Sequence, residues 1–219
     1  MNSQTHLLLA AALFAEPGQP KRNIAALGGA FVPDAAIYGL WLWSKIRGIP
    51  ENVVWGELYW QQPWQTYTAF GNSLPLYSAI LVAGVLTARF SLNAVPDIAH
   101  PTETANERWW QFVRRQPLII IFALAALAHL ACDFPVHVDD AHAHLWPLSD
   151  WRFYSPVSYW NPEHYGNWFA LFEMALGIGL AVLLFRRFHA FWVRALMVLA
   201  IIAYVAVPAY FILIIGGGS

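Results

Sequence analysis

The sequence AHLACDFPVHVDDAHAHLWPLSDWRFYSPVSYWNPEHYG, residues 128–166, separates two apolar runs and decides how the rest of the chain is interpreted. It begins inside one apolar run and leaves it through His129, Asp133 and His137. It then continues in Asp, His, Trp, Tyr and Pro until the next apolar run begins. It holds five of the eight histidines in the chain. We interpret it as the site-bearing segment of a small integral membrane protein.

The composition places the chain among membrane proteins. Of its 219 residues 58% are hydrophobic and only 11% are charged, whereas soluble domains carry about 25% charged residues. Such a chain has too little polar surface to cover a soluble globule. The 12 Trp and 9 Tyr are typical of aromatic belts at two membrane interfaces. The net charge of −1 gives no sign of a nucleic-acid partner, and the single cysteine, Cys132, excludes an internal disulfide.

The apolar runs predict an all-α, polytopic helical membrane protein with five to six transmembrane helices in one membrane domain, residues 1–215. A helical span needs about 20 apolar residues. The runs cover residues 5–15, 23–46, 74–90, 117–133, 167–185 and 190–215. The last five are long enough, whereas the first is a half-helix or a tilted span. A signal peptide is a rival interpretation of the first run, disfavoured because no Lys or Arg precedes it. Residues 216–219, Gly-Gly-Gly-Ser, are typical of a linker remnant.

The basic residues predict the orientation. Nine of the twelve Lys and Arg lie in or beside the loops after runs one, three and five, and only Lys45, Arg47 and Arg152 lie in the others. The nine are Lys21, Arg22, Arg89, Arg108, Arg114, Arg115, Arg186, Arg187 and Arg194. By the positive-inside rule, the 47–73 and 134–166 segments lie on the outer face and the polar 97–107 loop inside. We therefore expect a multi-pass protein of the bacterial inner membrane with a site on the periplasmic side.

Two aromatic stretches are expected to cover that outer face. Residues 50–70 hold three Trp and two Tyr with little charge, which favours an interfacial helix or lid at the headgroup level. Trp146–Trp160 has a similar character and predicts an interfacial cover. Membrane lipid is therefore an expected partner.

Asp34 is the first ionisable residue expected at membrane depth. It lies within the second apolar run, where a carboxylate costs about 2.5–3.5 kcal/mol on insertion scales. Pro33 removes a backbone donor beside it, and Gly28 and Gly29 allow a neighbouring helix to approach closely. Buried charge beside a helix break is how membrane proteins build ion sites. The structural alternative is a protonated carboxyl that bonds to a neighbour.

His129 and Asp133 form the second candidate pair. Four residues apart on a predicted helix, they share one face, and Pro135 predicts that the helix ends near Asp133. A carboxylate in the last turn meets the negative end of the helix dipole and favours a cation. Imidazole and carboxylate together suit zinc, iron or manganese. An internal His–Asp hydrogen bond is the structural alternative.

The remaining candidates flank this pair. His137 and one of Asp139 and Asp140 continue directly from it, although such loops are usually just solvated, and we expect His142 to be a bystander. Glu173 is a second acid within the membrane, either a general base or a carboxyl paired with a neighbouring helix. His6 lies near the outer start of the first run, where a lone interfacial histidine is the commoner outcome.

The order of these motifs resembles the YdjM-type family of membrane-bound metal-dependent hydrolases, also called LexA-binding inner-membrane-associated proteins. The matching motifs lie within residues 5–175. They are Thr5-His6-Leu7-Leu8, Val32-Pro33-Asp34, His129–Asp133, Trp146-Pro147, Trp151-Arg152-Phe153 and Glu173. The resemblance implies metal-dependent hydrolysis in a helical membrane fold.

Two departures from the family pattern concern metal ligands. The family has a His-Arg-x-x-Thr-His-Ser motif at the third helix, where this chain has Gly71-Asn72-Ser73-Leu74-Pro75-Leu76-Tyr77-Ser78. Ala35-Ala36 stand where an Asp-His follows the Pro-Asp motif. Either the cluster at 137–144 supplies substitute ligands, or this branch has lost hydrolysis.

Two hypotheses follow. In the first, His6, Asp34, His129, Asp133 and His137 hold a divalent metal, with zinc favoured. Asp140 or Glu173 acts as base in hydrolysis of a lipid-like or phosphoester substrate that enters from the outer face. In the second, the same residues form a structural metal site, a proton or metal path, or a buried network in a non-catalytic, partner-binding protein.

Overall fold

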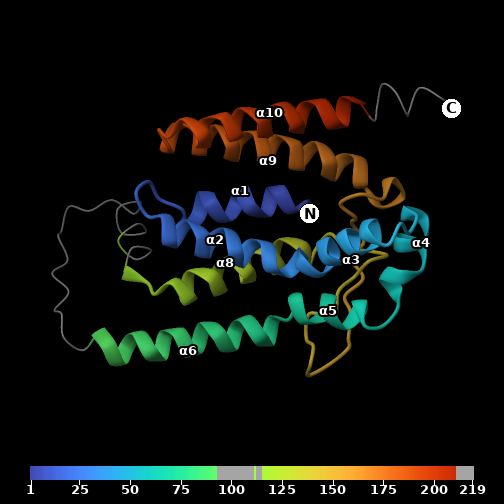
Figure 1. The fold of residues 1–219 in the computed structure, drawn as a ribbon, viewed down its shortest axis with the longest axis horizontal. Helices are drawn as coiled ribbons and strands as arrows, with labels where there is room; N and C mark the ends of the chain where they lie inside the picture. The colour runs from blue at the N-terminus through green and yellow to red at the C-terminus, as the bar shows by residue number, and fades with distance from the viewer. Residues whose placement is uncertain (93–110, 112–114, 211–219) are drawn as a thin grey trace.

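The computed structural model describes residues 1–92, 111 and 115–210, and its main elements are helices (Figure 1). The α-helices are α1 (Ser3–Phe14), α2 (Pro20–Phe31), α3 (Ala35–Ile46), α4 (Glu51–Gly56), α5 (Trp64–Gly71), α6 (Leu74–Leu92), α8 (Leu118–Asp133), α9 (Gly166–Arg187) and α10 (Phe191–Tyr210). Three 3₁₀ turns connect some of them: η1 (Val32–Asp34), η2 (Leu58–Trp60) and η3 (Pro162–His164). The expected all-α class is confirmed.

Four helical stretches of the described chain are long and apolar enough to cross a membrane, fewer than the expected five to six. They are Pro20–Ile46, Trp64–Ala88, Gly166–Arg187 and Phe191–Pro208. Two apolar helices are shorter: α1 has 12 residues, as its sequence indicates, and α8 has 16. At about 1.5 Å per residue α8 rises only about 24 Å. These two short helices carry His6, His129 and Asp133.

The helices lie roughly side by side, with α1, α2 and α8 in the middle (Figure 1). The α9–α10 pair packs on the α1 side, and α6 packs against α8 on the other. The centre consists of small and aliphatic side chains, with Ala10, Ala26, Ala30, Ile121 and Ala125 almost fully buried. This layer of small residues lets the three helices that carry the candidate ligands approach closely.

Gly29 marks the closest approach between α2 and α8. A Cβ atom there would lie 2.1 Å from the carbonyl oxygen of Phe122, whereas one at Gly28 would meet only the Phe122 ring at 3.9 Å. Close helix approach was predicted from both glycines. The structure assigns the tight contact to Gly29, one residue before a carbonyl that bonds to His129.

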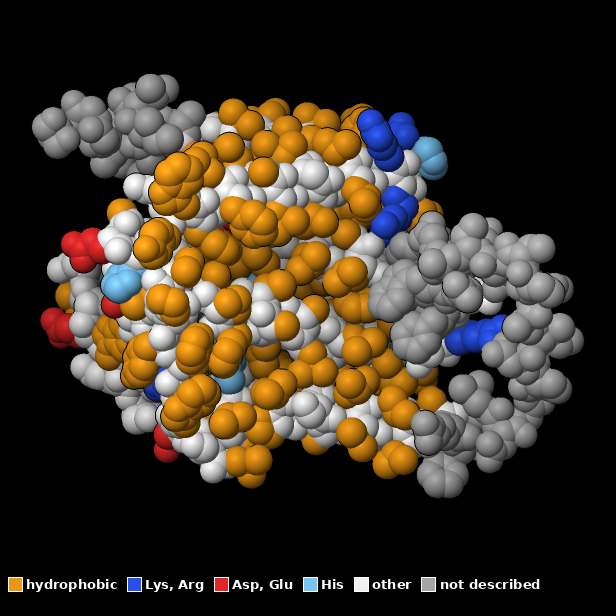
Figure 2. Space-filling model, turned by 180° about the vertical axis from the view of Figure 1, so that it is seen from behind, with side chains coloured by type: hydrophobic (Ala, Val, Ile, Leu, Met, Phe, Trp, Pro, Cys, Tyr) orange, Lys and Arg blue, Asp and Glu red, His pale blue; other side chains and the backbone are white. Residues whose placement is uncertain are grey.

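The outer surface supports a membrane-embedded chain. Large apolar side chains are exposed along the spans, including Leu86, Leu196, Leu199 and Ile202. In Figure 2 they form a broad hydrophobic band, with most of the visible Lys and Arg at one end and Asp and Glu at the other. The 97–107 loop, Arg108, Arg114 and residues 216–219 lie outside the described residues.

The two aromatic segments lie at the same end of the helices (Figure 1). Residues 50–70 form the short helices α4 and α5 with η2 between them, rather than one continuous interfacial helix. Trp55, Trp60, Trp151 and Trp160 are exposed there. One end of the helical bundle is thus rich in exposed aromatic side chains, and the candidate metal centre described below lies beneath it.

Candidate metal centre

A break between α2 and α3 positions Asp34. Pro33 lacks an N–H, and the chain tightens into the 3₁₀ turn η1 before α3 begins. Near this break the carbonyl of Ala30 accepts a hydrogen bond from His129 Nδ1, at 2.7 Å. Asp34 is 7% exposed, and its Oδ2 accepts from Ser3 Oγ. The proline therefore places a carboxylate inside the bundle beside α8.

His129 and Asp133 lie on one face of α8, as their spacing predicts. His129 Nε2 is 3.0 Å from Asp133 Oδ2 and 3.6 Å from Asp34 Oδ1. The helix ends at Asp133, two residues before Pro135. Because Nδ1–H donates to the Ala30 carbonyl, Nε2 is the His129 nitrogen that faces the two carboxylates and the one that would bind an ion. A metal-bound histidine commonly donates its second nitrogen to a carbonyl in this way.

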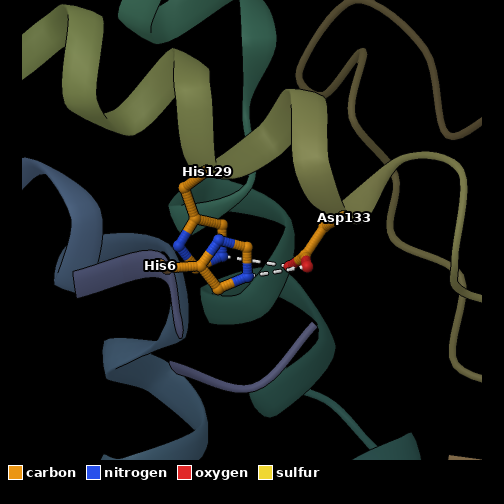
Figure 3. Close-up of side chains that lie close together, drawn as sticks. All are labelled: His6, His129 and Asp133. Carbon is orange, nitrogen blue, oxygen red and sulfur yellow. Dashed lines mark hydrogen bonds and ion pairs between the residues drawn. The ribbon is translucent and has the colours of Figure 1, made fainter. Parts of the chain in front are cut away.

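His6 on α1 completes the first cluster. Its ring stacks on His129 with 3.5 Å between the centroids, and its Nε2 is 2.8 Å from Asp133 Oδ1 (Figure 3). His6 and His129 are 2% and 1% exposed. One ligand atom each from His6, His129 and Asp133 lie within 4.8 Å of one another. His6 is therefore a buried member of the site and not an interfacial histidine.

The donor set and its spacing fit a divalent ion. Zinc holds nitrogen and oxygen ligands at about 2.0–2.2 Å, which sets tetrahedral ligand-to-ligand distances near 3.4 Å. The nitrogen-to-oxygen distances from His6 and His129 to the two carboxylates, 2.8, 3.0 and 3.6 Å, lie within about 0.6 Å of that value. Two buried carboxylates, Asp34 and Asp133, also favour a nearby cation. The Met1 amino group supplies one, at 2.7 Å from Asp133 Oδ1.

The segment after α8 is folded back over the cluster. Backbone hydrogen bonds join Ser155 N to the His137 carbonyl and Tyr159 N to the Val136 carbonyl, both at 3.0 Å. Arg152 donates to the Ala141 carbonyl and to Gln65 of α5. These bonds fix the segment and turn His137 towards Asp133.

Residues at the junction between α5 and α6 hydrogen-bond to this segment and to the helix break. Asn72 donates to the Pro33 carbonyl at 3.2 Å, and its own carbonyl is 3.1 Å from His144 Nδ1. Ser73 Oγ donates to the Trp146 carbonyl at 2.5 Å. Asn72 and Ser73 thus tie the 134–166 segment to the helix break at Pro33.

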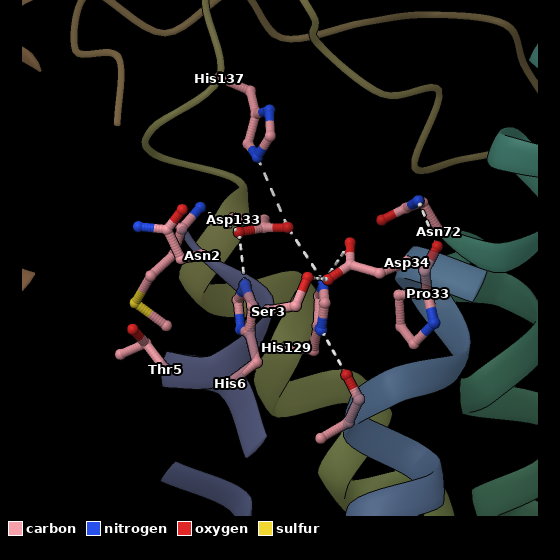
Figure 4. A network of polar contacts seen from close by, with 12 residues as sticks. Asn2, Ser3, Thr5, His6, Pro33, Asp34, Asn72, His129, Asp133 and His137 are labelled. Carbon is pink, nitrogen blue, oxygen red and sulfur yellow. Dashed lines mark hydrogen bonds and ion pairs between the residues drawn. The ribbon is translucent and has the colours of Figure 1, made fainter. Parts of the chain in front are cut away.

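His137 lies between two carboxylates. Its Nε2 is 3.5 Å from Asp133 Oδ2, and its Nδ1 is 3.0 Å from Asp140 Oδ1. Burial lowers the pKa of His137, but the contacts with the Asp133 and Asp140 carboxylates outweigh it and raise the pKa to about 9. Figure 4 places Asp133 between His137 on one side and His6 with His129 on the other.

His142, expected to be a bystander, is buried in the same cluster. It is 3% exposed, and its ring centroid is 4.7 Å from that of His137. Burial, followed by the nearby His137, holds its pKa well below the usual value, which favours the neutral imidazole. The flanking Ala141 and Ala143 are almost fully buried. Small residues alternating with histidine were the sequence signal that this stretch is packed.

A cavity of about 320 Å³ opens over the cluster. Its polar wall includes Asp34, Asp133, Asp140 and His142. The rest of the lining includes Ile37, Tyr38, Trp41, Trp55 and Tyr159. The cavity thus joins a polar floor of possible ligands to an aromatic rim.

Glu173 lies apart from the histidines. Its carboxylate accepts hydrogen bonds from Asn2 N at 2.7 Å, Asn2 Nδ2 at 2.8 Å and Thr5 Oγ1 at 2.6 Å. It lines a different cavity, between α9 and α10. Its geometry is that of a carboxyl paired with a neighbouring helix, the alternative left open by the sequence, and its role as a base stays a prediction.

The structure thus brings together all five predicted ligands and Asp140, with Glu173 at a distance. Ser3 and His142 are the members that sequence reasoning missed. No family model, curated protein or solved structure matches the chain. The site therefore has to be interpreted from its own chemistry.

Proposed function

We propose that the protein is a membrane-embedded, metal-dependent hydrolase for a lipid-like or phosphoester substrate. The observation that carries the proposal is the buried convergence of His6, His129 and Asp133 beneath an aromatic-rimmed cavity. Resemblance of the motifs to the YdjM-type family supports the same activity. Zinc is the favoured ion because the donors are imidazole and carboxylate.

Each residue has a role in this proposal. His6, His129 and Asp133 hold the ion, Asp34 adds a ligand from the η1 break, and His137 borders them. A divalent ion bound there would bring the pKa of a coordinated water towards about 7. Asp140 lines the cavity and would serve there as the general base or acid of the hydrolysis. The aromatic rim of Tyr38, Trp41 and Trp55 would bind the apolar part of the substrate.

The proposal places the chain in the bacterial inner membrane with the site on the periplasmic side. Its support is the distribution of charge. The start of α2, which carries Lys21 and Arg22, and the last turn of α9, which carries Arg186 and Arg187, lie at the end of the bundle opposite the site (Figure 1), as the positive-inside rule requires of a cytoplasmic face.

A non-catalytic role is the second candidate. One observation favours it: His6 and His129 are almost fully buried and do not line the cavity, as in structural metal sites, which are closed. In that case the ion would only hold α1, α2 and α8 together. Asp34→Asn would then lower the stability, and neither wild type nor the variant would hydrolyse a substrate.

Metal analysis followed by a hydrolysis assay tests both. We expect purified wild type to carry a divalent metal and His129→Ala to lose it, with the exposed His189→Ala as matched control. Metal-free wild type, or equal metal in His129→Ala, would overturn the metal site. Phospholipid and phosphoester hydrolysis should then fall in Asp34→Asn and persist in Asp139→Asn, whose carboxylate is exposed. Equal activity in the two variants would exclude Asp34 from the mechanism.

A further inference from the structure

Asp133 belongs to two groups of ligand atoms. The first consists of His6, His129 and Asp133, and the second of Asp133, His137 and His142. In each group the ligand atoms lie within 4.8 Å of one another, and every member is buried. Asp133 is thus shared, with histidine nitrogens approaching both of its oxygens.

The contacts of His137 in the second group are those expected of a metal ligand. His137 Nε2 faces Asp133 Oδ2 at 3.5 Å, close to the ligand-to-ligand distance around zinc, about 3.4 Å. Its other nitrogen, Nδ1, is 3.0 Å from Asp140 Oδ1. A carboxylate that orients the far nitrogen of a histidine is a recurrent feature of metal ligands. Besides its proposed role as base, Asp140 would thus position His137 through Oδ1.

His142 supplies an independent observation. It is 3% exposed, and its Nδ1 has no hydrogen-bond partner among the described residues. His137 Nε2, the nitrogen that faces Asp133, likewise makes no hydrogen bond among the described residues. Buried polar atoms are almost always satisfied. A ligand between His137, His142 and Asp133 would satisfy this otherwise unexplained set.

We propose that the chain holds a second divalent ion between Asp133, His137 and His142, with the Asp133 carboxylate bridging two ions. This inference rests on the proposed function for the first ion. It assigns His137 to the second ion and gives His142 a ligand role. Two ions sharing a carboxylate are typically about 3.5–4 Å apart, the spacing of two-metal sites that act on phosphoesters. The inference thus narrows the favoured substrate to a phosphoester with a lipid-like tail.

Metal stoichiometry tests the second site separately from the first. Wild type, purified in detergent and equilibrated with Zn²⁺ alone, should carry two ions per chain. His142→Ala should carry one, and His129→Ala should lose the first ion. His144→Ala is the matched control, because that histidine bonds to the Asn72 carbonyl and belongs to neither group. It should keep two.

The outcomes separate the two proposals. One ion in wild type, or two in His142→Ala, would overturn the second site and leave the proposed function intact. No ion in wild type would overturn both. A spectroscopic measurement needs no variant, in case His142→Ala does not fold. Wild type loaded with Mn²⁺ should show the electron paramagnetic resonance spectrum of an exchange-coupled pair, and the spectrum of isolated ions alone would overturn the bridge.

Discussion

Replacement of Gly29 by alanine should disrupt the site without touching any ligand. The new Cβ would lie 2.1 Å from the Phe122 carbonyl oxygen and 3.0 Å from Ala125 Cβ. Ordinary contact begins near 3.4 Å. Backbone cannot rotate away as a long side chain can, so α2 and α8 have to separate.

The expected shift follows from these distances. Relief of the overlap along the Cβ–oxygen line requires about 1.3 Å, the difference between 3.4 and 2.1 Å. The neighbouring Ala30 carbonyl is 2.7 Å from His129 Nδ1. A shift of that size would stretch this contact to about 4.0 Å, beyond hydrogen-bonding range. Overpacking of this kind costs about 1–3 kcal/mol, and loss of the bond frees the His129 ring.

Gly28→Ala is the control, because its Cβ would meet only the Phe122 ring at 3.9 Å. We expect Gly29→Ala to lower the thermal unfolding midpoint by several degrees and to reduce bound metal. Gly28→Ala should match wild type or exceed it slightly, since alanine favours helix over glycine by about 1 kcal/mol. Equal midpoints and equal metal content in the two variants would refute the tight α2–α8 contact and its link to His129.

Three further predictions concern the ion and the helix ends. A chelator should destabilise wild type by about 2.7 kcal/mol if the metal stands at a hundred times its dissociation constant, and should leave the midpoint of Asp133→Asn unchanged. Glu173→Gln would place an amide N–H₂ among the donors of Asn2 and Thr5. The free energy of unfolding should therefore fall by about 1–3 kcal/mol, with metal content retained. Loss of hydrolysis at an unchanged stability would instead support the base role. Arg187 donates to the carbonyls of Ala11, Ala12 and Ala15 at the end of α1. Arg187→Met should lower the free energy of unfolding, measured in urea or by heating, by about 1.5–3 kcal/mol. The matched change at the exposed Arg186, Arg186→Met, should lower it much less.

Much of the helical architecture could be predicted because hydrophobic runs in a membrane protein depend little on tertiary context. The 167–185 run became α9, and the end of α8 at Asp133 followed from Pro135. The shared face of His129 and Asp133 followed from the helical period alone. The span count was too high because the 117–133 run was taken to cross by itself, whereas its helix has 16 residues.

The 134–166 segment could not be predicted in the same way. It has little regular structure, and its path depends on long-range bonds such as Ser155 N to the His137 carbonyl and Arg152 to Gln65. No local periodicity encodes such contacts. His142 therefore looked solvent-facing, although Ala141 and Ala143 beside it are small enough to be packed.

The short reach of α8 links the fold to the site. A rise of about 24 Å falls short of the roughly 30 Å hydrocarbon thickness, so α8 alone is too short to cross a membrane. The chain leaves the helix after Asp133, and at membrane depth backbone without internal hydrogen bonds is tolerated only when protein covers it. The folded-back segment supplies that cover and brings His137 and His142 with it.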